Sequence, residues 1–245
     1  HKLDHIRPVA VVNDTVTTLL TAAYGDNCAD IGSICGTGHN TCYLEPNYPG
    51  ISYPMYINIE AGNFDKAPTS RYDDLLDAKS DRPGAGRLEK MCSGRYIGEL
   101  FRLLWLELSQ QGLLPNNPLT THFKAPYTLS GQHLALLLIG DSTWLTAKSP
   151  TCPEKTILRA IAEKIVIRSA RLVAATWLAV LMRIDPGVSR QHTIAIDGSL
   201  YEKMPGYAAA ISATLQELLG PKAVNINCRL TKDSSGVGAA IAAAI

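Results

Sequence analysis

The sequence lacks an excess of charge of either sign. Among its 245 residues, 23 are lysine or arginine and 22 are aspartate or glutamate, which gives a formal net charge of +1. Proteins that hold nucleic acid through their overall charge are strongly basic, so this class is not indicated. With 46% hydrophobic and 18% charged residues, the composition is typical of a globular protein with one large core or two modest domains.

Long hydrophobic runs are also missing. The longest, residues 172–182, lies between Arg171 and Arg183 and is shorter than the roughly 20 residues that cross a bilayer. It predicts a buried helix and no membrane association. The first residues are polar and show no signal peptide, which favours a cytoplasmic setting, and the start without methionine suggests a fragment of a longer chain.

Cysteine pairs with zinc spacing are absent as well. The six cysteines are scattered, so reduced thiols are expected, and the six histidines show no metal-ligand spacing on a predicted element. A bound transition metal is therefore not expected. We also find no internal repeat and no low-complexity segment.

Apolar and alternating runs predict six strands, separated by stretches with helical periodicity. Such a mixture predicts an α/β fold, with a mixed central sheet and helices on both faces. The strands are expected near residues 6–12, 31–35, 41–44, 53–59, 193–196 and 224–230. Helices are expected near residues 15–24, 72–78, 97–111, 129–139, 154–184 and 207–219, and after residue 233. Trp105 is expected to pack in the core, and Arg168 and Arg171 to be solvated.

The most informative run is Val9-Ala10-Val11-Val12, which leads directly into Asn13, Asp14 and Thr15. Four small or β-branched apolar residues predict a strand buried on both faces. A carboxylate at its end would lie at the rim of the sheet, where open α/β sheets bind ligands. Thr15 as a cap, with Asp14 favouring the positive end of the helix, is the simpler explanation on these residues alone.

Three further stretches place polar residues or glycines beside predicted strands. The turn Gly36-Thr37-Gly38 joins two predicted strands, and its amides could approach an anion, although tight hairpins also use glycine for geometry alone. A second acid, Glu60, follows another strand. The turn at residues 233–238 precedes the last helix and resembles a phosphate site, yet Ser234 also fits a simple N-cap, and the spacing matches neither a Walker A nor a Rossmann motif.

Taken in order, six motifs carry a resemblance that no single one carries: VNDT, GTGHN, NIEAGNF, RLEKMCSGRYIGEL, AIDGSLY and DSSGVGAA. This order resembles the large, C-terminal domain of the hexokinase family, which are sugar kinases with the actin-like ATPase fold. The resemblance covers the chain from Val9 to the last helix. It implies that residues 1–245 form this domain and that an N-terminal small domain is absent from the chain.

For the sugar side, the resemblance implies one catalytic residue and several ligands. Asp14 corresponds to the base that takes the proton from the sugar 6-hydroxyl. Asn13, Asn40, Glu60 and Glu89 correspond to groups that bind sugar hydroxyls, with Ala61 in place of a common tryptophan.

For the nucleotide side, the resemblance implies binding of ATP, with Mg²⁺ held mainly by the phosphates. Thr17 and Ser234 stand where the family has glycine, and Arg95 where it has lysine. The implied nucleotide-binding residues are Gly36, Thr37, Gly38, Gly94, Arg95, Asp197, Gly198, Ser199, Ser234, Ser235 and Gly236.

The predicted function is that of an ATP-dependent hexose kinase acting on the 6-hydroxyl of glucose or a related hexose, with hexose, ATP and the small domain as partners. Phosphoryl transfer depends on positioning and charge neutralisation, which suits these residue types. The family's first phosphate turn and its small-domain lysine loop are missing, so we expect the chain alone to turn over little substrate. The alternative is a non-catalytic sugar-sensing module, against which the retained Asp14, Thr37 and Glu60 argue. An actin-like or chaperone ATPase is disfavoured by Glu60 and Glu89.

Overall fold

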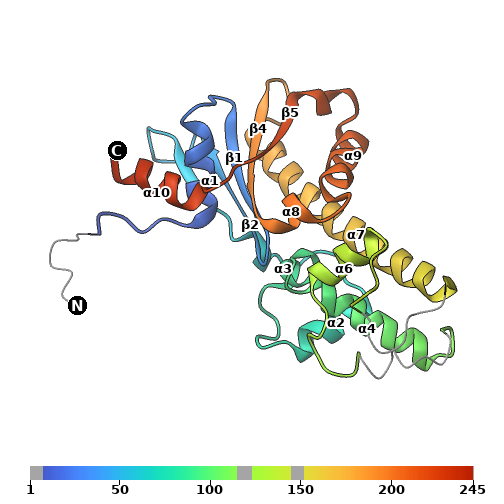
Figure 1. Ribbon diagram of the computed structural model, residues 1–245. Helices are drawn as coiled ribbons and strands as arrows, with labels where there is room; N and C mark the ends of the chain where they lie inside the picture. The colour runs from blue at the N-terminus through green and yellow to red at the C-terminus, as the bar shows by residue number, and fades with distance from the viewer. Residues whose placement is uncertain (1–7, 115–122, 145–151, 245) are drawn as a thin grey trace.

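The computed structural model describes residues 8–114, 123–144 and 152–244, and its centre is a mixed sheet (Figure 1). The five strands run in the order β3-β2-β1-β4-β5. β1 is antiparallel to β2, and β2 is antiparallel to β3, whereas β1 with β4 and β4 with β5 are parallel. The strands are β1 (Ala29–Cys35), β2 (His39–Glu45), β3 (Met55–Asn58), β4 (His192–Asp197) and β5 (Ile226–Leu230).

Helices cover both faces of this sheet, as the sequence predicts. On one face, Leu19 of α1 (Asp14–Ala23) packs with Ala195 of β4, and α10 (Ser234–Ala244) lies against α1. On the other face, Ile194 and Ile196 join a core with Trp177 of α7 (Cys152–Ile184). Helix α9 (Tyr207–Leu219) packs beside α7. Alternate residues of one strand thus face opposite layers, as the pleat requires.

A helical region continues from the tip of the β1–β2 hairpin along the far half of α7 (Figure 1). It contains α2 (Arg71–Lys79), α3 (Arg87–Cys92), α4 (Ile97–Gln110) and α6 (Gly131–Leu138). Trp105 is fully buried here and meets Phe123 edge to face, as its predicted core role requires. The remaining elements are α8 (Ser199–Lys203) and the 3₁₀ turns η1 (Ala61–Asn63) and η2 (Gly220–Asn225).

Helix α7 is the one helix among the described residues that is long and apolar enough to span a membrane by length and composition. Its fully buried Trp177 and Leu181 belong to the main core, so it is the core helix that the sequence predicts. Two of its arginines, Arg168 and Arg171, were expected to be solvated and are ion-paired as well. Arg168 binds Asp73 at 2.8 Å, and Arg171 binds Glu217 at 2.7 Å.

The strand predicted at residues 6–12 is wrong. Residues 8–12 are extended but belong to no sheet, with Val9 68% and Val11 100% exposed, and residues 6 and 7 lie outside the described residues. The segment runs along α10, where Val9 and Val12 line a small cavity with Ala239. A strand needs a neighbour to satisfy its amides and carbonyls, and no described strand lies beside this segment.

The other five predicted strands are present within a few residues of their expected bounds. Two short helices were not predicted, α3 and α8, because six and five residues are too few to show a helical period. Residues 115–122, between the helices predicted at 97–111 and 129–139, lie outside the described residues.

Candidate active site

The first turn of α1 holds Asn13 and Asp14 at the edge of the sheet. Asn13, and not Thr15, is the N-cap, since its Oδ1 accepts a hydrogen bond from the Thr15 amide at 2.9 Å. Asp14 is exposed and accepts from the same amide at 2.9 Å. The helix start is pressed against β1, where a Cβ on Gly32 would lie 2.5 Å from the Thr15 carbonyl oxygen. The cap and the base position are therefore one structural unit.

Asn58, at the end of β3, connects this unit to the predicted sugar ligands. Its Oδ1 accepts from Asn40 Nδ2 at 2.8 Å and from Thr15 Oγ1 at 3.4 Å. Its Nδ2 donates to Glu60 Oε1 at 2.6 Å. Asn40 Oδ1 in turn accepts from the Ala61 amide at 3.0 Å. A continuous chain of hydrogen bonds thus runs from the start of α1 to Glu60.

Glu60 itself has an unusual backbone. Its φ of 50° and ψ of 48° lie in the left-handed region, which a residue other than glycine adopts at a cost of about 1 kcal/mol or more. Two hydrogen bonds hold this conformation: Asn58 donates to the Glu60 side chain, and the amide of the next residue, Ala61, donates to Asn40. The strained residue is therefore an acid at the rim of the sheet.

Glu89 reaches the same edge from α3. Its Oε2 accepts from the His39 amide at 3.1 Å, one residue before Asn40. The approach is close, because a Cβ on Gly62 would lie 3.1 Å from the Glu89 Cβ. His39 adds no positive charge here: burial lowers its pKa to about 4, and its Nδ1 donates to the Ile34 carbonyl. Asp14, Asn40, Glu60 and Glu89 are thus brought together by neighbouring contacts.

The other side of the site is built on the turn between β1 and β2. The Gly94 amide donates to the Gly36 carbonyl at 2.9 Å, and the Arg95 amide donates to the Thr37 carbonyl at 3.2 Å. A Cβ on Gly198 would lie 2.3 Å from the Cys35 carbonyl oxygen, so the end of β4 also presses on this turn. The corner between α3 and α4 is thereby attached to the hairpin.

A cavity of about 580 Å³ opens beside this turn. Hydroxyls, backbone amides and two cationic side chains around one cavity suit a polyanionic ligand such as a phosphate chain. Five of the predicted nucleotide residues line it: Gly36, Thr37, Gly94, Arg95 and Ser199. Further lining residues are Tyr127, Leu129, Ser130, Gly131, Gln132, Ala135, Leu200, Lys203 and Met204.

The remaining predicted nucleotide residues lie elsewhere. Ser234 is buried and donates a hydrogen bond to Asp197, which ties α10 to the end of β4. Ser235 lines a separate cavity of about 160 Å³ that it shares with Asp14. Gly236 is exposed on α10, and Gly38 and Gly198 support the turn without being among the residues that line the larger cavity.

The serine that replaces a family glycine at position 234 fits without strain. The left-handed residue of this turn is Asp233, with φ of 52°, and Ser234 is already the first residue of α10. Its hydroxyl also lies 2.9 Å from Thr18 Oγ1. Ser234 thus acts as a joint between α10, α1 and β4.

Sequence reasoning did not identify Asn58, Lys203 or the lining residues of the 127–135 segment. Asn58 carried a signal, since it lies near the end of the strand predicted at residues 53–59 and two residues before Glu60. Lys203 follows Ser199 on a helix too short to be predicted. Residues 127–135 contain only the start of the helix predicted at residues 129–139, with no residue pattern that points to a ligand. Among the described residues, no group of three or more His, Cys, Asp or Glu side chains could hold a metal ion.

Comparison with known proteins places this geometry in a family. The sequence model described as Hexokinase matches residues 30–245. Hexokinase-7 of Oryza sativa subsp. japonica is 35% identical over 98% of this chain and 57% of its own length. Hexokinase-1 of Saccharomyces cerevisiae is 34% identical over 98% of this chain and 55% of its own length. The chain thus spans a little more than half the length of these relatives.

Solved structures agree with the sequence comparison. The hexokinase from Schistosoma mansoni complexed with glucose superimposes with a TM-score of 0.86 at 31% identity, covering 98% of this chain and 58% of that one. The ROK hexokinase from Thermus thermophilus, at 19% identity and a TM-score of 0.53, shares the fold alone. The mixed sheet with helices on both faces is therefore the actin-like ATPase fold, and the chain belongs to the hexokinase family.

Proposed function

We propose that this chain carries the base and the nucleotide-binding surface of an ATP-dependent hexose 6-phosphotransferase. The observation that carries the proposal is the set of hydrogen bonds that links Asp14 through Thr15 to Asn58, and Asn58 to both Asn40 and Glu60. Glu89 joins this set by binding the amide of His39, the residue before Asn40. Glucose is the favoured sugar, because one relative is named a glucokinase and another structure holds glucose.

In this proposal Asp14 accepts the proton of the sugar 6-hydroxyl as its oxygen attacks the γ-phosphorus of ATP. The exposed carboxylate on the first turn of α1 is free to face that hydroxyl. Asn40, Glu60 and Glu89 supply fixed acceptors and donors for the other hydroxyls, which reject a sugar that leaves one of them unpaired.

The cavity beside Thr37 is proposed to hold the nucleotide. Amides at the glycine turn and the cations Arg95 and Lys203 would neutralise phosphate charge. Mg²⁺ would be held mainly by the phosphates and water, which agrees with a cavity that is lined by cations and hydroxyls. When bound, the ion withdraws charge from the transferred group.

A second domain is part of the proposal. The exposed, extended apolar residues Val9 and Val11 lead directly into Asp14, and they would gain a covering surface from such a domain. That domain would close over the sugar and exclude water from the transfer. A cytoplasmic location is proposed with it, since the cysteines at positions 28, 35, 42, 92 and 228 are free thiols in the described part of the chain.

The variant Asp14→Asn, made in the full-length protein that the gene encodes, tests whether Asp14 is the base. The amide keeps the size of the side chain but cannot take a proton, so we expect turnover with glucose and ATP to fall by about 10²-fold to 10⁴-fold. Glucose affinity, measured by calorimetry, should change by no more than about 3-fold. Asp65→Asn, on an exposed acid paired only with Lys66, is the matched control.

The outcomes separate the candidate functions. Unchanged turnover in Asp14→Asn would exclude Asp14 as the base. A parent protein that binds glucose but never phosphorylates it would favour a sugar-sensing module.

A further inference from the structure

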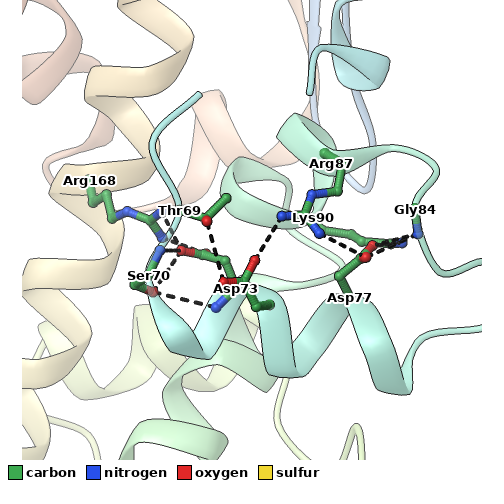
Figure 2. A network of polar contacts seen from close by, with 9 residues as sticks. Thr69, Ser70, Asp73, Asp77, Gly84, Arg87, Lys90 and Arg168 are labelled. Atoms are coloured by element: carbon green, nitrogen blue, oxygen red, sulfur yellow. Dashed lines mark hydrogen bonds and ion pairs between the residues drawn. The ribbon is translucent and has the colours of Figure 1, made fainter. Parts of the chain in front are cut away.

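A buried cluster of charges surrounds Asp77 on α2 (Figure 2). Asp77 Oδ1 accepts from Lys90 Nζ at 2.6 Å, and Oδ2 accepts from Arg87 Nη1 at 2.9 Å. The Gly84 amide donates to both oxygens, at 3.2 and 3.0 Å. Lys90 Nζ also donates to the Arg82 carbonyl at 2.6 Å. We call these residues (77, 82, 84, 87 and 90) the Asp77 cluster.

Burial of these charges costs desolvation free energy. The side chains of Lys90 and Asp77 are only 5% and 10% exposed. Burial raises the pKa of Asp77, but the hydrogen bonds from Lys90, Gly84 and Arg87 outweigh it and hold the pKa below its usual value. Because desolvation offsets most of the attraction within a buried ion pair, fixed geometry is the main gain from such a cluster.

The element that the cluster fixes is α3. This helix has six residues, begins after the left-handed Gly86 and has no side-chain cap. A helix of this length is not stable alone, so its position depends on tertiary contacts. Arg87 and Lys90, which Asp77 holds, lie on either side of Glu89 in the chain. Asp77 therefore anchors the backbone that carries Glu89.

The tolerance for movement at Glu89 is small. Its carboxylate accepts from the His39 amide at 3.1 Å, and its Cβ lies close to Gly62. A shift of α3 by 1 Å would lengthen the bond to His39 beyond hydrogen-bond reach. Misplacement of a binding group by this distance lowers enzymatic efficiency by about 10²-fold in unfavourable cases.

We infer that Asp77 is a positioning residue for the sugar site, acting through Lys90 and Arg87 to hold Glu89 against the β1–β2 hairpin. The inference rests on the proposed function for the role of Glu89. It adds a residue that touches no substrate and lies on a different helix from every predicted site residue.

The same helix offers a matched control. Asp73 is also a buried, ion-paired acid of α2, but it binds Arg168 of α7 through two hydrogen bonds at 2.9 and 2.8 Å. Asp73→Asn and Asp77→Asn remove the same charge from the same helix. Loss of either anchor should lower the melting temperature, but only loss of Asp77 removes the ion pair to Lys90 of α3 and leaves Arg87 with Asp74 as its partner at 2.8 Å.

The experiment compares Asp77→Asn, Asp73→Asn and Asp77→Glu in the protein as its gene encodes it, at a temperature where all are folded. Asp77→Asn should raise the KM for glucose about 10-fold and leave the KM for ATP within about 3-fold. Asp73→Asn should keep the parent KM for glucose, and Asp77→Glu should recover most of the loss. Lys90→Arg, which keeps the charge but changes the geometry, takes the place of Asp77→Asn if that variant does not fold.

A second readout does not depend on catalysis. Amide hydrogen exchange should become about 10-fold faster at His39 and across residues 87–93 in Asp77→Asn relative to Asp73→Asn. Equal exchange and equal KM in the two variants would overturn the inference. A parent without glucose phosphorylation would count against the proposed function, while the exchange comparison would still decide the role of Asp77.

Discussion

Asn58 shows how one side chain joins the site at the residue scale. Its side-chain oxygen accepts hydrogen bonds from Asn40 and Thr15, and its side-chain nitrogen donates one to Glu60. Neither a carboxylate nor a hydroxyl offers both a fixed donor and a fixed acceptor at these two points. The identity of this residue therefore sets the orientation of two predicted sugar ligands.

Truncating this side chain should weaken sugar binding. Asn58→Ala removes the acceptor of Asn40 Nδ2 and the donor to Glu60 Oε1, at a cost of about 1–3 kcal/mol, so we expect the glucose Kd to rise by about 5-fold to 100-fold. Calorimetric titration with glucose measures this. Asn225→Ala, which removes a comparable bond to the Val188 carbonyl near the far end of β5, is the control and should leave the Kd unchanged. A parent-like Kd in Asn58→Ala would show that the chain of bonds does not orient the ligands.

The roles of Asp14 and Asn40 were predicted from the resemblance to the hexokinase family. Position at a strand end indicated only Asp14 and Glu60, and the strand predicted before Asp14 is absent. The same logic applied to Asn58, but an amide draws less attention than an acid. Lys203 and Tyr127 could not be predicted, because the 580 Å³ cavity that they line forms only when α8 and the segment before α6 come together.

At the element scale, the first helix depends on close contact with the sheet. A Cβ on Gly32 of β1 would lie 2.5 Å from the Thr15 carbonyl oxygen and 2.8 Å from the Leu19 Cβ. Only a residue without a side chain allows this approach. The turn of α1 that carries Asp14 is therefore set by a glycine on a neighbouring strand.

Gly32→Ala should move α1 and impair both stability and turnover. Overpacking of this kind costs about 1–3 kcal/mol, and each kcal/mol lowers the Tm by about 2–4 °C in a chain of this size. Thermal unfolding and glucose turnover measure the two effects. Gly25→Ala, just beyond the other end of α1, is the control, since its added Cβ would meet nothing within 4 Å. Equal Tm values for the two variants would contradict the account.

Elements were predictable where their own residues determine them. The strands of the sheet and helices such as α7 and α9 have periodic sequences and enough length. The run at residues 9–12 has the composition of a strand, but strand formation requires a partner, and composition carries no information about one. For helix α3 the reverse holds: its six residues are too few to show a helical period in the sequence, and contacts with the Asp77 cluster fix it in the fold.

At the scale of the whole molecule, the two ends of the sheet carry different groups of charged residues. The site lies where β4 ends at Asp197, and a histidine with two acids lies where β4 begins. His192 is fully buried, with Nδ1 2.7 Å from Asp30 and Nε2 3.2 Å from Asp185, and Arg190 binds Asp30 at 2.7 Å. This end ties β1, β4 and the end of α7 together, so its charge state should affect global stability.

The pH dependence follows from opposing effects on His192 and Asp185. Burial lowers the pKa of His192, but the hydrogen bonds and charge of Asp30, with the bond to Asp185, outweigh it and raise the pKa. Stabilisation by the protonated ring is thus complete below the unfolded pKa of about 6.5 and is lost as the pH rises through the folded value. Burial raises the pKa of Asp185, but bonds from Ser189, His192 and Arg190 hold it well below its usual range. That contribution is lost as the pH falls.

His192→Gln should therefore destabilise the protein most near pH 6 and less near pH 9. Glutamine keeps part of the hydrogen bonding but none of the charge, so the Tm difference from the parent should be larger at pH 6 by about 2–4 °C, equivalent to about 1 kcal/mol. Calorimetric unfolding at both pH values measures the difference. Asp185→Asn in the His192→Gln background should add no further dependence between pH 6 and 9, because the titrating ring is already gone. A Tm difference that is constant from pH 6 to 9 would mean that folding does not change proton binding by His192, and a smaller difference at pH 6 than at pH 9 would mean that the ring is neutral in the folded protein.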